Sequence, residues 1–231
     1  SNPSTQFCIL RENTEGLYTK IGGIFKKNTL DEIALQEEIN TRKGVERILR
    51  YAFEWAQQAG YKVTMADKFN AMNYGHDLWQ RVFLSLQKEY PDVKAEHYYV
   101  DVLAMKLITE PDRFDLIVTN NLFGDILADE AAALIGGLGF APSANFNPGT
   151  GLGLFEPVHG SAPDIAGKNK ANPIAAILTL GLLLNHLGFG EAREAIEFAV
   201  TEWVNQTPQD ANLTTSEVGQ AILNLLQLSL T

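Results

Sequence analysis

Two aspartates stand at the predicted start of a helix, directly after a short apolar run. Asp125 and Asp129 belong to the segment N-N-L-F-G-D-I-L-A-D, which follows a predicted strand at 115–119 (D-L-I-V-T). A spacing of four residues places both carboxylates on one face of the helix, and paired carboxylates suit Mg²⁺ or Mn²⁺. Acidic side chains also favour helix N-termini for electrostatic reasons alone. The metal interpretation is favoured because ligands of open α/β sheets bind at the carboxyl ends of strands.

Other side chains that could do chemistry lie at or near the ends of predicted strands. Each has an ordinary structural explanation when it is taken alone, such as a surface cation, a helix cap or a buried tyrosine. The segments around them are more informative than the single residues. The side chains at strand ends are Arg11, Lys68 and Asp101, and Tyr18 joins them from the first predicted turn.

Predicted strands and helices alternate along the chain, which indicates α/β layers. Thr41 and Gly60 bound the first predicted helix as cap residues. The glycine-marked segment 21–28 predicts an exposed ribbon or arm, and 31–40 is ambiguous between helix and strand. Strands are predicted at 7–10, 62–66, 94–99 and 115–119, and helices at 41–60, 74–90, 102–108, 171–187, 190–204 and 216–228.

Composition and motifs exclude several kinds of partner and site. The net charge of −10 argues against nucleic acid and anionic membranes as partners. The single cysteine, Cys8, cannot form an internal disulfide, and the sequence contains no signal peptide or apolar run of membrane-spanning length. We therefore expect a soluble, cytoplasmic protein. The glycines at 149, 151 and 153 lack the spacing of a dinucleotide fingerprint, and the four histidines lack zinc-ligand spacing.

Five segments occur here in the order found in the metal-dependent β-decarboxylating dehydrogenases. They are R-E-N-T-E-G-L-Y, D-K-x-N, Y-V-D-V-L-A-M, N-L-F-G-D-I-L-A-D and E-P-V-H-G-S-A-P-D-I-A-G-K-x-x-A-N-P. Over essentially its whole length the sequence resembles this family, which includes isocitrate, homoisocitrate, 3-isopropylmalate, tartrate and D-malate dehydrogenases.

The resemblance implies an α/β, isocitrate/isopropylmalate dehydrogenase-like, non-Rossmann fold with a large and a small domain. It also implies a homodimer with shared active sites. Residues 1–130 would form mainly the small domain, for dimerisation and for metal and substrate binding. Residues 131–231 would form the remainder of the large, cofactor-binding domain.

The resemblance implies a role for each reactive side chain near the substrate. Arg11 and Asn70 would bind the substrate, Tyr18 would protonate the product carbon, and Lys68 would transfer a proton at the 2-hydroxyl. In the implied reaction, hydride leaves C2 for the nicotinamide, and the β-carboxylate of the 2-keto acid is then lost as CO₂. A general base and a general acid are needed for the two proton transfers.

The resemblance also implies a divalent metal, Mg²⁺ or Mn²⁺, held by Asp101, Asp125 and Asp129. The metal would stabilise negative charge on the substrate oxygen as a Lewis acid. Lys68 and Asp101 would come from the partner subunit.

The loop 156–172 resembles the family's adenosine-binding loop. Asp164 favours NAD, because a carboxylate accepts hydrogen bonds from the free ribose hydroxyls of NAD and repels the 2′-phosphate of NADP. Family members that use NADP carry a basic residue at this place. The implied cofactor contacts are Glu156, His159, Gly160, Ser161, Ala162, Asp164, Ile165 and Asn172.

The substrate stays open among small 2-hydroxy dicarboxylates and tricarboxylates. R-E-N-T-E-G is similar to isocitrate, homoisocitrate and D-malate enzymes, A-P-S-A-N-F-N-P to tartrate and D-malate enzymes, and A-D-K-F-N-A-M to isopropylmalate enzymes. We expect a malate that carries some 3-substituent or none.

The family has a long segment before R-E-N-T-E-G, which supplies the N-terminal part of the large domain, and this sequence lacks it. An alternative from another class is therefore a non-catalytic homologue or fragment that assembles with a complete dehydrogenase subunit. The retained carboxylates, lysine and tyrosine argue against that alternative, because a subunit freed from catalysis has no chemical need for them.

Overall fold

The computed structural model describes residues 6–208 and 211–229 and has the α/β fold that the sequence predicts. The chain divides into two compact units, Ser1–Ala131 and Ala132–Thr231. The strands are β1 (Cys8–Arg11), β2 (Gly16–Phe25), β3 (Ile33–Ile39), β4 (Val63–Asp67), β5 (Ala95–Tyr99), β6 (Leu116–Thr119), β7 (Ala144–Phe146) and β8 (Gly153–Phe155). The helices are α1 (Arg42–Ala59), α2 (Gly75–Glu89), α3 (Val100–Thr109), α4 (Asn121–Leu134), α5 (Ile174–His186), α6 (Gly190–Gln206) and α7 (Thr215–Ser229), and short 3₁₀ turns are η1 (Pro111–Arg113), η2 (Leu138–Phe140) and η3 (Pro163–Ile165).

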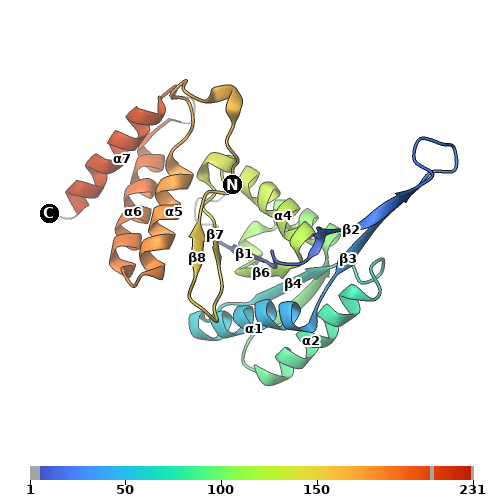
Figure 1. The fold of residues 1–231 in the computed structure, drawn as a ribbon. Helices are drawn as coiled ribbons and strands as arrows, with labels where there is room; N and C mark the ends of the chain where they lie inside the picture. The colour runs from blue at the N-terminus through green and yellow to red at the C-terminus, as the bar shows by residue number, and fades with distance from the viewer. Residues whose placement is uncertain (1–5, 209–210, 230–231) are drawn as a thin grey trace. The chain divides into compact units, whose positions relative to one another are not determined.

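The first unit is built on a sheet with the strand order β1-β6-β4-β5, in which every neighbouring pair is parallel. All residues of β4 are buried, as expected for a parallel strand that is covered on both faces. Helices α1 and α2 lie on one side of the sheet and α4 on the other (Figure 1). The core between the sheet and the first two helices includes Val45, Leu49, Phe53, Val63, Met65, Trp79, Val82, Phe83, Leu86, Leu116 and Val118.

Because the strands are parallel, their carboxyl ends meet at one edge of the sheet. Arg11 ends β1 and pairs with Thr119 at the end of β6. Asp67 ends β4 and pairs with Tyr99 at the end of β5. This edge therefore carries the reactive residues that the sequence places at or just beyond the strand ends.

Helix α1 begins and ends where its capping residues predict. The Thr41 side chain accepts a hydrogen bond from the Gly44 N–H at 3.0 Å. Gly60 takes the left-handed conformation, with φ of 71°, that ends a helix without the steric cost of a Cβ. The predicted boundaries of this helix are confirmed.

The predicted ribbon is present as an antiparallel pair of β2 and β3, which extends away from the rest of the first unit (Figure 1). The ambiguous segment 31–40 therefore contains a strand rather than a helix, because it pairs with residues of β2. Apolar side chains on this arm are exposed: Ile21, Ile24, Phe25, Leu30, Ile33 and Leu35.

The second unit consists mainly of α5, α6 and α7 and the antiparallel hairpin β7–β8. Its core joins the three helices and contains Ile174, Ala199, Val200, Val218 and Ile222. In the described part of the chain, no helix is both long and apolar enough to cross a membrane.

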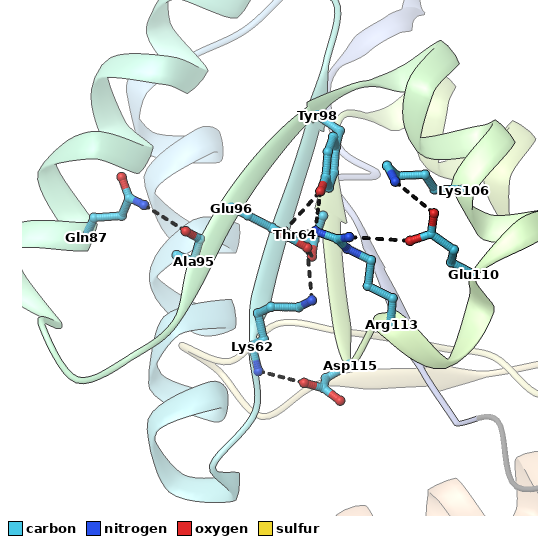
Figure 2. Close-up of polar contacts among 10 residues, drawn as sticks. All are labelled: Lys62, Thr64, Gln87, Ala95, Glu96, Tyr98, Lys106, Glu110, Arg113 and Asp115. Atoms are coloured by element: carbon cyan, nitrogen blue, oxygen red, sulfur yellow. Dashed lines mark hydrogen bonds and ion pairs between the residues drawn. The ribbon is translucent and has the colours of Figure 1, made fainter.

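Polar side chains cover the outer edge strand β5 of the parallel sheet (Figure 2). Glu96 forms ion pairs with Lys62 at 3.0 Å and with Arg113 at 2.9 Å. Gln87 donates a hydrogen bond to the Ala95 carbonyl at 3.2 Å. Although burial raises the pKa of Glu96, hydrogen bonds from Arg113 and Lys62 lower it from 4.5 to about 2. Such charges also protect an edge strand from pairing with other chains.

We expect Glu96→Gln to lower the free energy of unfolding by about 1–2 kcal/mol at neutral pH. The folded-state pKa lies below the unfolded one, so the carboxylate's contribution is complete above about 4.5 and disappears as the pH falls toward about 2. Denaturant unfolding of both proteins across this range should show the difference shrinking on the acid side. The control Glu194→Gln, at an exposed glutamate of α6, should have little effect. A difference that stays constant down to the lowest pH would contradict the ion pairs.

Candidate active site

Asp125 is the centre of the first group of predicted site residues. One carboxylate oxygen accepts a hydrogen bond from Arg11 Nη1 at 2.5 Å, and the other accepts one from the Tyr18 hydroxyl at 2.8 Å. The Arg11 guanidinium also lies over the Tyr18 ring, 5.3 Å from its centroid. Three elements, β1, β2 and α4, thus bring together a cation, a phenol and a carboxylate. Their chemical roles stay a prediction.

Asn121 also belongs to this group, although the sequence did not predict it as a site residue. Its amide N–H donates to the Glu15 carbonyl at 2.8 Å, so its Oδ1 faces Arg11. Oδ1 accepts from Arg11 Nε at 3.0 Å and from Nη2 at 2.8 Å. The amide therefore fixes the plane of the guanidinium and leaves Nη1 directed at Asp125.

Gly124 lets the first turns of α4 approach Arg11 closely. A Cβ at this position would lie 2.6 Å from Arg11 Cγ and 3.2 Å from Arg11 Cα. Since the Cα atom belongs to the backbone of β1, the clash could not be relieved by a change of side-chain rotamer alone. The glycine in N-L-F-G-D thus serves the packing of the site.

The turn after Arg11 is held by two glutamates with different partners. Glu12, which is 3% exposed, accepts hydrogen bonds from the backbone N–H groups of Thr14 and Glu15, both at 3.0 Å. It also forms an ion pair with Arg47 of α1 at 2.7 Å. Glu15 accepts from the N–H and hydroxyl of Thr41 at 2.7 and 2.8 Å, which ties the turn to the start of α1.

The pKa of Tyr18 is raised above its ordinary value, first by its hydrogen bond to Asp125 and then by desolvation and by the Asp125 charge. The phenol therefore keeps its proton at neutral pH. A protonated phenol is suited to act as a general acid.

Lys68 and Asp101 form a second group. Lys68 follows β4 directly, and its Nζ donates to Asp101 Oδ1 at 2.5 Å. The ammonium also lies 5.6 Å from the centroid of the Tyr99 ring. The hydrogen bond from Lys68 is the main reason that the pKa of Asp101 is lowered.

Asp67, next to Lys68, is 1% exposed and anchors the turn that follows β4. It contacts His97 Nε2 at 2.9 Å, and it accepts from Gln80 at 2.6 Å and from the Phe69 N–H at 3.1 Å. Burial raises the pKa of Asp67, but these hydrogen bonds outweigh burial and lower it overall.

The remaining predicted residues of the first unit make fewer contacts. Asn70 is exposed in the turn after Lys68, and Asp129 is exposed one helical turn beyond Asp125. Within residues 6–208 and 211–229, no group of three or more histidine, cysteine, aspartate or glutamate side chains could hold a metal ion. In one copy of the chain, Asp101, Asp125 and Asp129 therefore do not form such a group, and Asp101 is paired with Lys68.

In the second unit, the loop after β8 lines a hollow of about 290 Å³. Five of the predicted cofactor residues line it: His159, Gly160, Ser161, Ala162 and Ile165. The other three predicted residues, Glu156, Asp164 and Asn172, do not line it. Asp164 is exposed on η3. The Asn172 side chain accepts a hydrogen bond from the Ile174 N–H at 3.0 Å, at the start of α5.

Thr215, at the start of α7, also lines the hollow and was not expected there. Its hydroxyl donates to the Ala171 carbonyl at 2.5 Å, and its N–H donates to the Asn169 carbonyl at 3.0 Å. The Asn169 side chain accepts from the N–H and hydroxyl of Ser216. The loop is therefore fastened to the first turn of α7 by residues far apart in the sequence.

The sequence model of the isocitrate/isopropylmalate dehydrogenase family matches residues 2–223. The 3-isopropylmalate dehydrogenase of Corynebacterium glutamicum (strain R) is 48% identical over 96% of this chain and 65% of its own length. That of Thermobifida fusca is 46% identical over 93% of this chain and 61% of its own length. The chain thus spans a little less than two thirds of these curated relatives.

Solved structures agree with the sequence comparisons. The crystal structure of isocitrate dehydrogenase from Methylococcus capsulatus matches with a TM-score of 0.89 at 42% identity, over 96% of this chain and 67% of that chain. The TT0538 protein of Thermus thermophilus matches with a TM-score of 0.88 at 37% identity, over 98% of this chain and 46% of that chain. The resemblance and the fold predicted from the sequence are confirmed.

Proposed function

Because this chain belongs to the isocitrate/isopropylmalate dehydrogenase family, we propose that its full-length protein carries out NAD-dependent and divalent-metal-dependent oxidative decarboxylation of a malate-type 2-hydroxy acid. The observation that carries the proposal is the position of Asp125. Its carboxylate joins Arg11 and Tyr18 at the carboxyl edge of the sheet, one helical turn before Asp129.

The chain's carboxylates fit a divalent cation. Asp125 and Asp129 offer oxygen ligands from the same helix, and Asp101 of a second subunit would complete the set. When bound, Mg²⁺ or Mn²⁺ would supply Lewis-acid stabilisation of negative charge on the substrate oxygen.

The chain's own side chains supply binding and proton transfer. Arg11, with its guanidinium plane fixed by Asn121, would bind a substrate carboxylate, with Asn70 as a further substrate contact. Tyr18 holds a proton that it would give to the product carbon. Lys68 would take or return the proton at the 2-hydroxyl.

The division into two groups supports a homodimer with shared sites. Lys68 pairs with Asp101, whereas Arg11 and Tyr18 both pair with Asp125. We propose that each site combines one group from each subunit. Exposed apolar side chains on the β2–β3 arm, and Met105 and Ile108 on α3, provide surface that a second copy could cover.

The hollow in the second unit supports the NAD assignment. Its volume of about 290 Å³ is close to the lower end of the range of about 300–1,000 Å³ for ligand clefts, so it fits the adenosine end of the cofactor better than the whole. We propose that Asp164, exposed on η3 of the same loop, faces the ribose hydroxyls and disfavours the 2′-phosphate of NADP. Residues 1–130 would then be mainly the small domain and 131–231 the remainder of the large domain.

Among the possible substrates, 3-isopropylmalate is favoured because relatives that are 44–48% identical carry the name 3-isopropylmalate dehydrogenase. The other candidate substrates are tartrate, D-malate, isocitrate and homoisocitrate.

The test is a substrate panel on the full-length protein with Mg²⁺ or Mn²⁺. NAD⁺ should be reduced, with CO₂ release in equal amount, fastest with 3-isopropylmalate and slower with D-malate, tartrate and isocitrate. NADP⁺ should be used at least about tenfold less efficiently, as a repelled phosphate costs more than about 1.4 kcal/mol. Inactivity with all four substrates at full metal occupancy would refute the enzyme and favour the non-catalytic assembly subunit.

A further inference from the structure

His76 holds the backbone of Lys68 from inside the first unit. The ring is 0% exposed, and its Nδ1 accepts a hydrogen bond from the Lys68 N–H at 2.7 Å. Because Nδ1 acts as an acceptor, the neutral ring carries its proton on Nε2. The tautomer of a buried histidine is thus set by the same residue whose side chain is proposed to move a proton.

The other side of the ring faces the base of the β2–β3 arm. Nε2 lies 3.5 Å from Glu38 Oε2 near the end of β3, and the Glu38 side chain is 8% exposed. Asn120 donates to Glu38 Oε1 at 2.8 Å, and its own Oδ1 accepts from the Phe123 N–H at 2.9 Å, which fixes the orientation of the amide. Asn120 Nδ2 also lies 3.1 Å from Nε2. Because Nδ1 is the acceptor for Lys68, Nε2 carries the ring proton and faces the Glu38 carboxylate at 3.5 Å. A carboxylate that faces the Nε2 proton orients the ring toward Lys68.

Two further contacts keep the end of β3 against the start of α2. Trp79 Nε1 donates to Asn40 Oδ1 at 2.8 Å. A Cβ on Gly75 would lie 2.5 Å from Asn40 Nδ2 and 3.3 Å from Glu38 Oε2, so the glycine permits the close approach. The His76 ring is therefore held in place by packing as well as by hydrogen bonds.

Lys68 is fixed at its backbone and is directed outward at its side chain. Its carbonyl accepts from the N–H groups of Ala71 and Met72 at 2.9 and 2.8 Å, while its Nζ reaches Asp101. The N–H bond to His76 joins the first residue of this turn to the buried interior, beside the bond from the Phe69 N–H to Asp67. Loss of that acceptor would leave a part-buried N–H unpaired and would free the turn to shift.

We propose that His76 is a positioning residue for Lys68, and that Glu38 at the base of the arm orients His76 for this task. The proposal rests on the proposed function of Lys68. It gives a reason for a histidine at a fully buried position, and it makes the base of the arm part of the support of the active site.

The first test compares three variants of the full-length enzyme. His76→Leu removes the acceptor and should lower kcat about 100-fold, because misplacement of a reacting group by about 1 Å can cost that much, while KM for the substrate changes little. His76→Asn places an amide oxygen where Nδ1 was and should restore kcat to within about tenfold of wild type. Val82→Ala, at a buried position of the same helix, loses packing without touching Lys68 and should leave kcat unchanged.

The second test does not need activity. Amide hydrogen exchange at Lys68 should be at least about tenfold faster in His76→Leu than in wild type, but not in His76→Asn or Val82→Ala. The proposal is overturned if the wild type is active and His76→Leu changes neither kcat nor the rate of amide exchange at Lys68. If the wild type itself is inactive, the proposed function fails, and the exchange result alone decides whether His76 anchors the Lys68 turn.

Discussion

Asp125→Asn should lower the kcat of the full-length enzyme about a thousandfold or more. The carboxylate accepts hydrogen bonds from Arg11 and Tyr18, and it is the proposed metal ligand closest to both. An asparagine keeps the size of the side chain but removes the charge and turns one acceptor into a donor. With the amide oxygen facing Arg11, the amide N–H would face the Tyr18 hydroxyl, which could then no longer donate to this side chain. Because a neutral amide is also a weaker ligand for a divalent cation than a carboxylate, metal binding should suffer as well.

The measurement is steady-state NADH formation at several Mg²⁺ or Mn²⁺ concentrations, with thermal unfolding as a check on folding. The matched control is Asp92→Asn, the same substitution at an exposed aspartate in the turn before β5, away from the carboxyl ends of the strands. The control should keep wild-type activity. An Asp125→Asn enzyme with activity close to that of Asp92→Asn would remove Asp125 from the metal site.

The parts of the fold with local signals were predictable from the sequence. Helix α1 has its cap residues, Thr41 and Gly60, within the segment itself, so its boundaries needed no tertiary information. Asp125 and Asp129 could be paired because a four-residue spacing defines a helix face. The segment 31–40 was ambiguous because its strand state depends on pairing with β2, which no local pattern reports.

The supporting residues of the site were missed for a related reason. Asn121 and Arg11 are 110 residues apart, and neither segment indicates by itself that an amide will orient the guanidinium. His76 was considered only as a possible zinc ligand, because its partners, Lys68 and Glu38, belong to other elements. The role of Thr215 in the hollow likewise depends on a contact to Ala171, 44 residues away. Such contacts arise from packing, whereas the proposed reactive residues were predicted from the sequence segments that surround them.

If the active sites are shared between subunits as proposed, a dimer of two different inactive variants should regain activity. In a homodimer of Lys68→Ala, every site lacks its lysine, and in one of Asp125→Ala every site lacks a metal ligand, so both should be inactive. In a heterodimer of the two variants, both lesions fall in the same site, because Lys68 would come from one subunit and Asp125 from the other. The second site of that heterodimer should then be intact.

The most direct measurement is therefore the activity of the two full-length variants after complete subunit exchange, with differently tagged subunits to prove that heterodimers form. Equal mixing makes about half of the dimers heterodimers with one working site of two, so the mixture should recover about a quarter of wild-type activity. The purified heterodimer should reach about half. A heterodimer as inactive as the separate variants would place Lys68 and Asp125 in the same site of one subunit and would contradict the shared active site.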